Sequence, residues 1–126
     1  MNVVDSSGWL EYFADGPNAN FFAPAIEDTD NLLVPTISLL EVFKRVTEQR
    51  GEDAALQAAA LIQQGKMVDL DASIALEAAR VGMEHKLPMA DSVILASARI
   101  HGATIWTQDA DFKGLEEVKY VPARKR

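Results

Sequence analysis

The sequence predicts an α/β domain of three layers, in which a mainly parallel sheet of about five strands lies between two layers of helices. Short apolar runs alternate with longer segments of helical periodicity, and a length of 126 residues is typical of one domain. With 48% hydrophobic and 25% charged residues, the composition is that of a globular protein. We therefore expect a single domain over residues 1–126, with a flexible basic tail at 122–126.

Five short runs are predicted to form buried strands. Each run is apolar and is bounded by turn or cap residues, as expected for strands inside a sheet. They cover residues 2–5, 32–35, 67–70, 104–107 and 118–121.

The segments between these runs are predicted to be helices that face a core. Apolar residues recur at three- and four-residue spacing, for example at Leu39, Phe43 and Val46. The segment 90–100 is apolar around most of its circumference, so we expect it to pack on two sides. Because helices alternate with strands, right-handed crossovers and a parallel sheet follow. Helix starts are indicated near Ser6, Asn18, Thr36, Asp71 and Pro88, and helix ends near Gly51, Gly65 and Gly102.

Charge and composition exclude several classes of function. The chain has 19 acidic and 12 basic residues, a net charge of -7, which opposes binding of nucleic acid by bulk charge alone. Divalent cations can cancel clustered acids locally, so a nucleic-acid substrate is not excluded. With no cysteine, disulfides, thiolate metal sites and cysteine nucleophiles are excluded. The sequence has no G-x-S-x-G elbow or glycine-rich phosphate loop. No basic leader and no apolar run of about 18 residues is present, so we expect a soluble cytoplasmic protein without membrane contact.

Acidic residues follow the predicted strands. Asp5 and Asp109 stand at or just beyond the ends of two strands, and Glu41 follows a third by about one and a half helical turns. Ligands of parallel α/β sheets bind at the carboxyl ends of the strands. Asp91 lies in the first turn of an apolar helix that leads into a strand. We expect such a helix to begin at the opposite edge of the sheet, so only tertiary packing can place Asp91.

Each acid also has a purely structural interpretation. Asp5 is a suitable cap for the helix that follows it, and Asp91 can interact with the helix dipole. Glu41 is a helix residue of a type that is usually solvated. Asp109 can belong to an Asx-turn, with Asp111 as the cap of a short helix. These alternatives stay open for each residue alone, and the combination favours a shared site.

A site made of carboxylates favours a particular cation. Mg²⁺ prefers oxygen ligands and keeps several waters, and Mn²⁺ accepts the same ligands, whereas zinc favours histidine and cysteine. Crowded carboxylates repel one another, so we expect the metal-free site to hold protons at raised pKa values. An ion at such a site activates water for attack at phosphorus.

Four segments of the chain resemble the PIN domain family, and specifically the VapC-type toxin ribonucleases of toxin–antitoxin pairs. They are VVDSSGWLEYF, ISLLEVFKRV, LPMADSVILASARIHGATIWTQDADF and VKYVP, and the resemblance covers essentially the whole chain. It implies that Asp5, Glu41, Asp91 and Asp109 form a metal-binding active site at one pocket. Asp5, Asp91 and Asp109 are then expected to hold a first ion, and Glu41 a second if two are used.

The resemblance also implies an activity and partners. The expected protein is a Mg²⁺-dependent endoribonuclease toxin with an RNA substrate, a VapB-like antitoxin partner and a homodimeric state. Ser6 and Thr107 are candidates to support the carboxylates through their hydroxyl groups. Asp111 resembles a further acid of the family, for which a surface or capping role is preferred. The RNA that is cut, the number of ions and the dimer face are left open.

Two other functions compete with the nuclease. One is a catalytically silent PIN-like module that binds RNA or protein, which the presence of all four acids disfavours. The other is a phosphoacceptor receiver, which is expected to carry an acidic pair after its first strand, whereas Asp5 is followed by Ser6 and Ser7.

Basic and aromatic residues are candidates for contact with RNA or protein. A solvated surface is the default for each basic residue, and core packing for the aromatic residues, some of which are alternatively expected at an antitoxin interface. The candidates are Lys44, Arg45, Arg50, Lys86, Arg99 and the basic tail, with Trp9, Tyr12, Phe13, Phe21 and Phe22.

Overall fold

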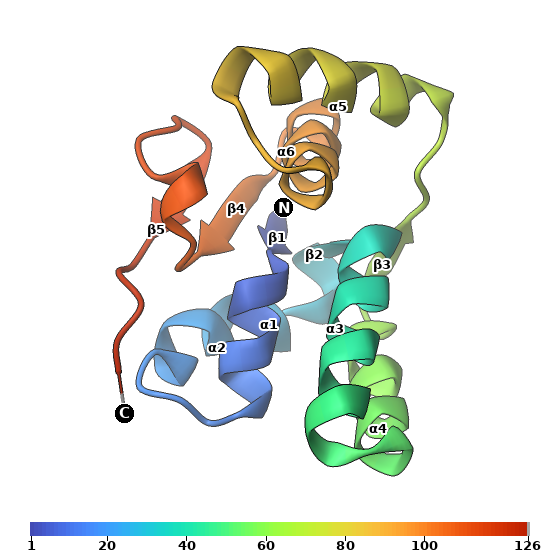
Figure 1. Cartoon of the computed structure of the whole chain (residues 1–126), viewed down its shortest axis with the longest axis vertical. Coiled ribbons are helices and arrows are strands. Elements are labelled where there is room, and N and C mark those ends of the chain that lie inside the picture. Colours follow the sequence, from blue (N-terminus) through green and yellow to red (C-terminus); the bar gives the residue numbers. More distant parts are fainter. Residues whose placement is uncertain (126) are drawn as a thin grey trace.

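The five strands form one parallel sheet. The computed structural model describes residues 1–125, and within them the sheet has the order β3-β2-β1-β4-β5 with every neighbouring pair parallel (Figure 1). The mainly parallel five-stranded sheet predicted from the sequence is confirmed. The strands are β1 (Asn2–Val4), β2 (Leu32–Pro35), β3 (Lys66–Val68), β4 (Thr104–Thr107) and β5 (Val118–Tyr120).

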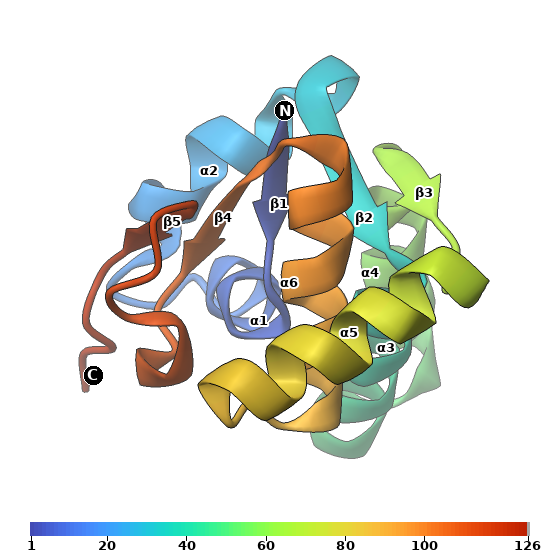
Figure 2. The same ribbon diagram turned by 90° about the horizontal axis from the view of Figure 1, so that it is seen from above.

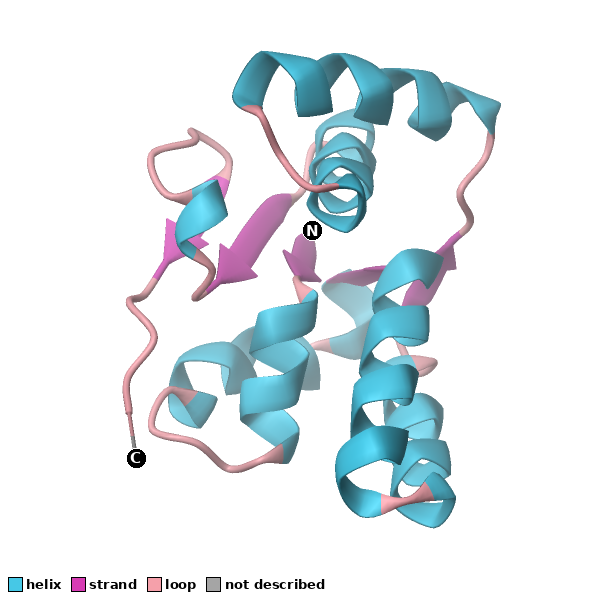
Figure 3. Ribbon diagram, in the orientation of Figure 1, coloured by secondary structure: helices cyan, strands magenta, loops and turns pink. Residues whose placement is uncertain are grey.

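Helices cover both faces of this sheet, so the predicted three-layer architecture is also confirmed. The helices α1 to α4 lie on one face, and α5 and α6 lie on the other (Figure 3). Two short 3₁₀ turns, η1 and η2, precede β2 and follow β4. The bounds are α1 (Ser6–Phe13), α2 (Ala19–Glu27), η1 (Thr29–Asn31), α3 (Thr36–Arg50), α4 (Glu52–Ile62), α5 (Ala72–His85), α6 (Met89–His101) and η2 (Ala110–Phe112).

Two apolar clusters form the core, one on each side of the sheet. Val3 belongs to the cluster under α5 and α6, and its neighbour Val4 belongs to the cluster under α1 to α4. Both side chains are fully buried. Successive strand residues point to opposite faces, so short strands that are apolar on both faces can hold the two helical layers together.

Capping moves two strand ends from their predicted positions. The first strand ends at Val4 instead of residue 5, because Asp5 caps α1. The third strand is Lys66–Val68 instead of 67–70, because the chain turns away toward Asp71, whose side chain caps α5. The last strand ends at Tyr120, one residue earlier than predicted. An N-cap residue needs a backbone conformation outside the helix, which breaks the run.

The start of α1 lies unusually close to its neighbours, and Gly8 makes this possible. A Cβ atom on Gly8 would lie 2.6 Å from Phe22 Cε1 and 2.7 Å from Val4 Cγ1. Such distances are well inside van der Waals contact, so any larger side chain would push α1 away from α2 and the sheet. Since Asp5, Ser6 and Ser7 immediately precede Gly8, this packing also fixes the backbone of the candidate site.

The segment that follows β5 makes specific contacts through Arg124. Its Nε donates to Asn18 Oδ1 at 2.9 Å and its Nη2 donates to the Pro17 carbonyl at 3.1 Å. The buried Asn18 amide donates to Gln108 Oε1 and to the Pro122 carbonyl, both at 2.9 Å. Flexibility of the tail 122–126 stays a prediction, and Arg126 lies outside the described residues.

Across residues 1–125, none of the helices combines the length and the apolar character needed to cross a membrane.

Candidate active site

Asp5 occupies the junction of β1 and α1 and is almost completely buried. Its exposure is 2%, and its carboxylate accepts hydrogen bonds from the Gly8 backbone N–H at 3.0 Å and from Ser7 Oγ at 2.8 and 3.0 Å. Asp5 is therefore the N-cap of α1, as its structural interpretation proposed. The same hydrogen bonds hold the carboxylate at the carboxyl end of the central strand of the sheet.

The Thr107 hydroxyl forms hydrogen bonds with two of the predicted acids, Asp5 and Asp109. Its Oγ1 donates to Asp5 Oδ2 at 2.8 Å and accepts from the Asp109 backbone N–H at 2.9 Å. The hydroxyl is fully buried at the end of β4, which pairs directly with β1. Thr107 thus makes the hydrogen bond to a carboxylate for which the sequence made it a candidate.

Glu41 is held by the other candidate hydroxyl. Ser6 Oγ donates to Glu41 Oε1 at 2.5 Å, a contact between residues 35 positions apart. Ser6 is the first residue of α1 and not its cap, so its hydroxyl is free for this contact. Because Glu41 lies in the second turn of α3, the bond fixes α3 against the start of α1.

Asp91 lies at the same edge of the sheet as the other acids, in the shared pocket that the resemblance implies. The expectation from chain order alone, that its helix begins at the opposite edge, was wrong. The helix α6 runs against the direction of β1 (Figure 2) and ends just before β4 begins. A helix that is antiparallel to the strands and ends at their amino edge must begin at their carboxyl edge. Topology alone therefore brings Asp91 to the acids, without any special feature of the fold.

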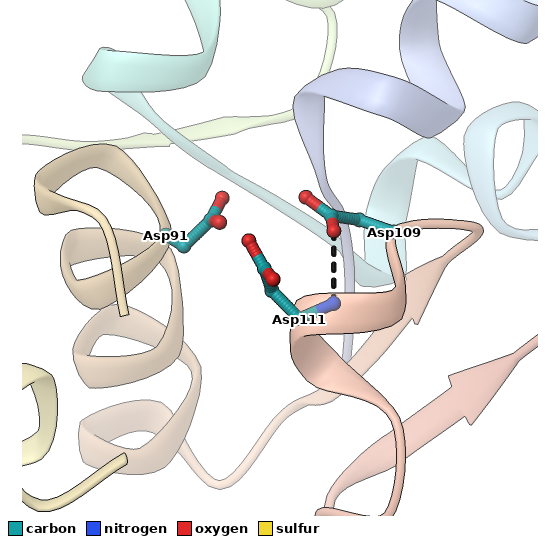
Figure 4. A group of neighbouring side chains, drawn as sticks. All are labelled: Asp91, Asp109 and Asp111. Atoms are coloured by element: carbon teal, nitrogen blue, oxygen red, sulfur yellow. Dashed lines mark hydrogen bonds between the residues drawn. The ribbon is translucent and has the colours of Figure 1, made fainter. Parts of the chain in front are cut away.

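Three carboxylates come together closely enough to bind one ion. Ligand oxygens of Asp91, Asp109 and Asp111 all lie within 4.8 Å of one another, and Figure 4 shows the three side chains pointing toward a common space. Asp91 comes from α6, and the other two come from η2 and its N-cap. Asp109 caps η2 by accepting from the Asp111 backbone N–H at 2.9 Å. The cap is therefore Asp109 and not Asp111.

Burial and crowding raise two pKa values in this cluster. Burial raises the pKa of Asp5 to about 6, against the lowering effect of its hydrogen bonds to Thr107, Ser7 and Gly8. Burial also raises the pKa of Asp91 to about 7, with further contributions from the charges of Asp109, Asp5, Asp111 and Glu41. All five carboxylates therefore act on one electrostatic site, and the metal-free cluster holds protons near neutral pH.

The donor set of the cluster fits a hard divalent cation. Five carboxylates converge here, whereas His101 ends α6 at the opposite end from Asp91, and His85, the last residue of α5, contacts Arg99. Mg²⁺ and Mn²⁺ prefer oxygen ligands, so this set of carboxylates fits either ion.

The sequence pattern predicted neither a metal role for Asp111 nor a supporting role for Ser7. The structure places the Asp111 carboxylate beside Asp91 and Asp109, and Ser7 donates to both oxygens of Asp5. The signal for Ser7 was its position two residues after a predicted cap, where a hydroxyl can reach back to the cap. The signal for Asp111 was the spacing Asp-x-Asp, because a 3₁₀ turn brings the carboxylates of Asp109 and Asp111 to the same side of the chain.

Two open grooves border the acids. One has a volume of about 500 Å³. Its polar lining residues are Ser6, Glu41, Lys44, Arg45 and Glu48, and the others are apolar residues of α1, α3 and α6. The other has a volume of about 300 Å³ and lies along α1 and α3 beside the loop that follows β4. Its polar lining residues are Ser7, Glu11, Arg45, Gln49 and Gln108. Extended ligands can therefore approach the cluster from two directions.

Solved structures with the same fold include bacterial toxins. The chain is similar to a toxin–antitoxin complex from Klebsiella pneumoniae, with a TM-score of 0.79 and 21% identity, covering 94% of this chain and 96% of that one. It is similar to VapC20 from Mycobacterium tuberculosis, described as a Sarcin-Ricin loop cleaving toxin, with a TM-score of 0.77, 20% identity and coverages of 94% and 98%. VapBC2 from Rickettsia felis, bound to a DNA fragment from its promoter, matches with a TM-score of 0.71, 15% identity and coverages of 96% and 97%.

No curated protein matches the chain by sequence. The family model of the PIN domain, in contrast, matches residues 3–118, which span β1 to the start of β5 and include all five carboxylates of the cluster. By this match and by its fold, the chain belongs to the PIN domain family.

Proposed function

We propose that this PIN domain is a Mg²⁺-dependent endoribonuclease and the toxin of a type II toxin–antitoxin pair. The observation that carries the proposal is the convergence of carboxylates from β1, α3, α6 and the β4–η2 loop at the carboxyl edge of the sheet. Oxygens of three of them lie within 4.8 Å of one another. A cluster of this density is unfavourable unless cations or protons neutralise it, so it supports a metal site.

The proposed metal ligands are Asp5, Glu41, Asp91 and Asp109, to which the structure adds Asp111 as a candidate. Mg²⁺ is the proposed ion and Mn²⁺ the proposed substitute, because both take carboxylate oxygens and retain water. When bound, such an ion supplies an activated water and neutralises charge at the scissile phosphate. The geometry of Asp91, Asp109 and Asp111 supports at least one such ion.

The protein's own residues keep these ligands in place. Thr107 and Ser7 orient the Asp5 carboxylate, and Ser6 orients Glu41. Carboxylates that are already oriented lose little conformational freedom when they bind an ion, so their affinity for it rises. Ser6 and Thr107 are accordingly proposed as supporting residues.

The substrate and the protein partner are proposed from solved structures of the same fold. VapC20 is described as cleaving the Sarcin-Ricin loop, which supports RNA as the substrate class. The complex from Klebsiella pneumoniae pairs a toxin with an antitoxin, which supports a VapB-like antitoxin as the inhibitor. We place the protein in the cytoplasm, where RNA and such an antitoxin are available, and treat residues 1–126 as one PIN-like domain.

Exposed apolar side chains support a protein partner, and a homodimer is part of the proposal. Met83 and Met89 are 77% and 82% exposed, and both line an apolar groove of about 510 Å³ beside α5 and α6. Exposed apolar grooves of this kind are typical of surfaces that another chain covers.

The test is cleavage of total RNA by purified protein freed of any antitoxin, in Mg²⁺ or Mn²⁺, with a chelator control. We expect metal-dependent cutting that Asp5→Asn reduces at least about 100-fold, because the ion loses a charged ligand. Asp71→Asn is the matched control, since Asp71 also caps a helix and accepts from Ile74 N at 2.9 Å but lies outside the cluster. Well-folded protein that cuts no RNA in either metal would favour the binding module over the nuclease.

A further inference from the structure

Two cations on α3, Lys44 and Arg45, are candidates for RNA contact that take no part in the carboxylate cluster. Lys44 and Arg45 follow Glu41 by three and four residues, so they lie one helical turn beyond it on the same side of the helix. Both side chains are exposed. In residues 1–125, neither side chain forms an ion pair or a hydrogen bond, although Glu41 and Glu48 are one turn away.

Arg45 stands where the two grooves beside the acids meet. Arg45 and Leu10 are the residues that line both grooves. The larger groove contains Glu41, and the smaller one contains Ser7 and Gln108, the neighbours of Asp5 and Asp109. Any extended ligand that binds at the carboxylates and continues into both grooves therefore passes Arg45.

In a strongly acidic molecule, these two cations are suited to bind an anionic ligand. The chain carries a net charge of -7, and five acids surround the site. Lys44 and Arg45 are the cations among the residues that line the two grooves. A guanidinium binds a phosphate through two parallel N–H donors, and a free lysine adds a mobile point charge.

We propose that Arg45 and Lys44 bind the phosphates of an RNA strand that runs from the carboxylate cluster into the two grooves. This inference rests on the proposed nuclease function and names residues that hold its substrate beside the carboxylate cluster. Arg45 contacts the backbone where the grooves join, and Lys44 contacts it inside the larger groove. Both residues bind phosphate groups and not bases, so they add affinity without sequence preference.

The experiment measures binding of a fluorescently labelled single-stranded RNA oligonucleotide in Mg²⁺ at several NaCl concentrations. All proteins carry Asp5→Asn, so that the RNA is not consumed. Arg45→Ala, Lys44→Ala and Arg45→Lys are compared with Arg80→Ala, which removes one exposed charge from α5 on the other face of the sheet. Circular dichroism and thermal unfolding verify that each variant is folded.

The logarithm of the association constant falls linearly with log[NaCl], and for single-stranded nucleic acid each lost phosphate contact makes this fall less steep by about 0.7. We expect a less steep slope for Arg45→Ala and for Lys44→Ala. Arg45→Lys and Arg80→Ala should keep the slope of the protein that carries Asp5→Asn alone. Equal slopes in all variants, or no binding by folded protein at low salt, would overturn the proposal.

The proposed function and this inference fail in different ways. If the protein without Asp5→Asn cleaves RNA but the slopes do not change, the nuclease stands and the phosphate contacts are refuted. If the slopes change but metal-dependent cleavage is absent, the cations bind RNA in a module that does not cut it.

Discussion

The hydroxyl of Thr107 links the first and last acids of the sequence pattern by donating to Asp5 Oδ2 at 2.8 Å and accepting from the Asp109 N–H at 2.9 Å. Asp5 and Thr107 are 102 positions apart in the chain, and adjacent parallel strands bring them together. One buried hydroxyl therefore sets both the carboxylate at the end of β1 and the turn that presents Asp109 and Asp111.

Thr107→Val is expected to weaken both folding and activity. Valine matches the shape of threonine but leaves the half-buried Asp109 N–H and one oxygen of the buried Asp5 without this partner, at a cost of about 1–3 kcal/mol. Urea unfolding measures the stability, and RNA cleavage at saturating Mg²⁺ measures the activity. Thr107→Ser keeps the hydroxyl and should recover most of both. A serine variant as impaired as the valine variant would show that the methyl group, and not the hydrogen bonds, matters.

The stability of the metal-free protein should fall as the pH rises from about 4 to about 8. The pKa of Asp5 is raised from 3.8 to about 6 and that of Asp91 to about 7. The folded state thus binds protons more tightly than the unfolded state, and the stability that this provides is lost as the pH passes the folded pKa values.

Thermal unfolding in a chelator at pH 5 and pH 8 measures this effect. The difference in Tm between the two pH values should shrink by about 3 °C or more in Asp91→Asn, because 1 kcal/mol changes Tm by a few degrees in a domain of this size. Mg²⁺ should stabilise the protein at pH 8 more than at pH 5, since the ion competes with protons. Identical pH profiles for wild type and Asp91→Asn would refute the shared electrostatic site.

Asp111→Asn tests whether the metal cluster extends beyond the four acids that the sequence identified. Removing one charged ligand from the group of Asp91, Asp109 and Asp111 should lower the Mg²⁺ affinity about 10-fold or more, as measured by calorimetry. Asp28→Asn, an exposed acid at the end of α2, is the control and should bind Mg²⁺ as wild type does. If Asp111→Asn binds the ion equally well, its carboxylate has only a surface role.

Gly8→Ala should destabilise the protein because the new methyl group would overlap Phe22 and Val4. Overpacking of this kind costs about 1–3 kcal/mol. Since the displaced segment begins α1, the hydrogen bond from Gly8 N to Asp5 should weaken as well. Urea unfolding measures the first effect, and Mg²⁺ affinity measures the second. Stability equal to that of wild type would mean that α1 can shift without cost.

The arrangement of strands and helices was predictable because each strand is short, apolar and bounded by cap or turn residues. The strand ends were less predictable, since Asp5 and Asp71 act as helix caps and end the adjacent runs earlier. A carboxylate that suits a cap and a metal site equally cannot be assigned from its position alone. In the structure Asp5 is a cap and also belongs to the cluster.

The residues of the candidate site were predictable to the extent that they follow strand ends. Asp5 and Asp109 were placed by this rule. For Asp91, chain order alone indicated the opposite edge, whereas the resemblance to the PIN domain family implied the shared pocket, and the direction of α6 explains its position (Figure 2). The contact of Asp111 with Asp91 depends on a 3₁₀ turn, and the pair of Ser6 and Glu41 joins residues far apart in the chain. Such contacts arise from tertiary packing and leave no local pattern.

The most direct test of a carboxylate-held metal that cleaves RNA is the single-turnover cleavage rate of one defined RNA as a function of Mg²⁺ concentration. For the wild type, we predict a rate that is zero in chelator and saturates with Mg²⁺. For Asp109→Asn, we predict a rate at least about 100-fold lower at saturation, because the bound ion supplies the activated water. A rate that is independent of Mg²⁺, or unchanged in Asp109→Asn, would contradict cleavage by a metal ion that these carboxylates hold.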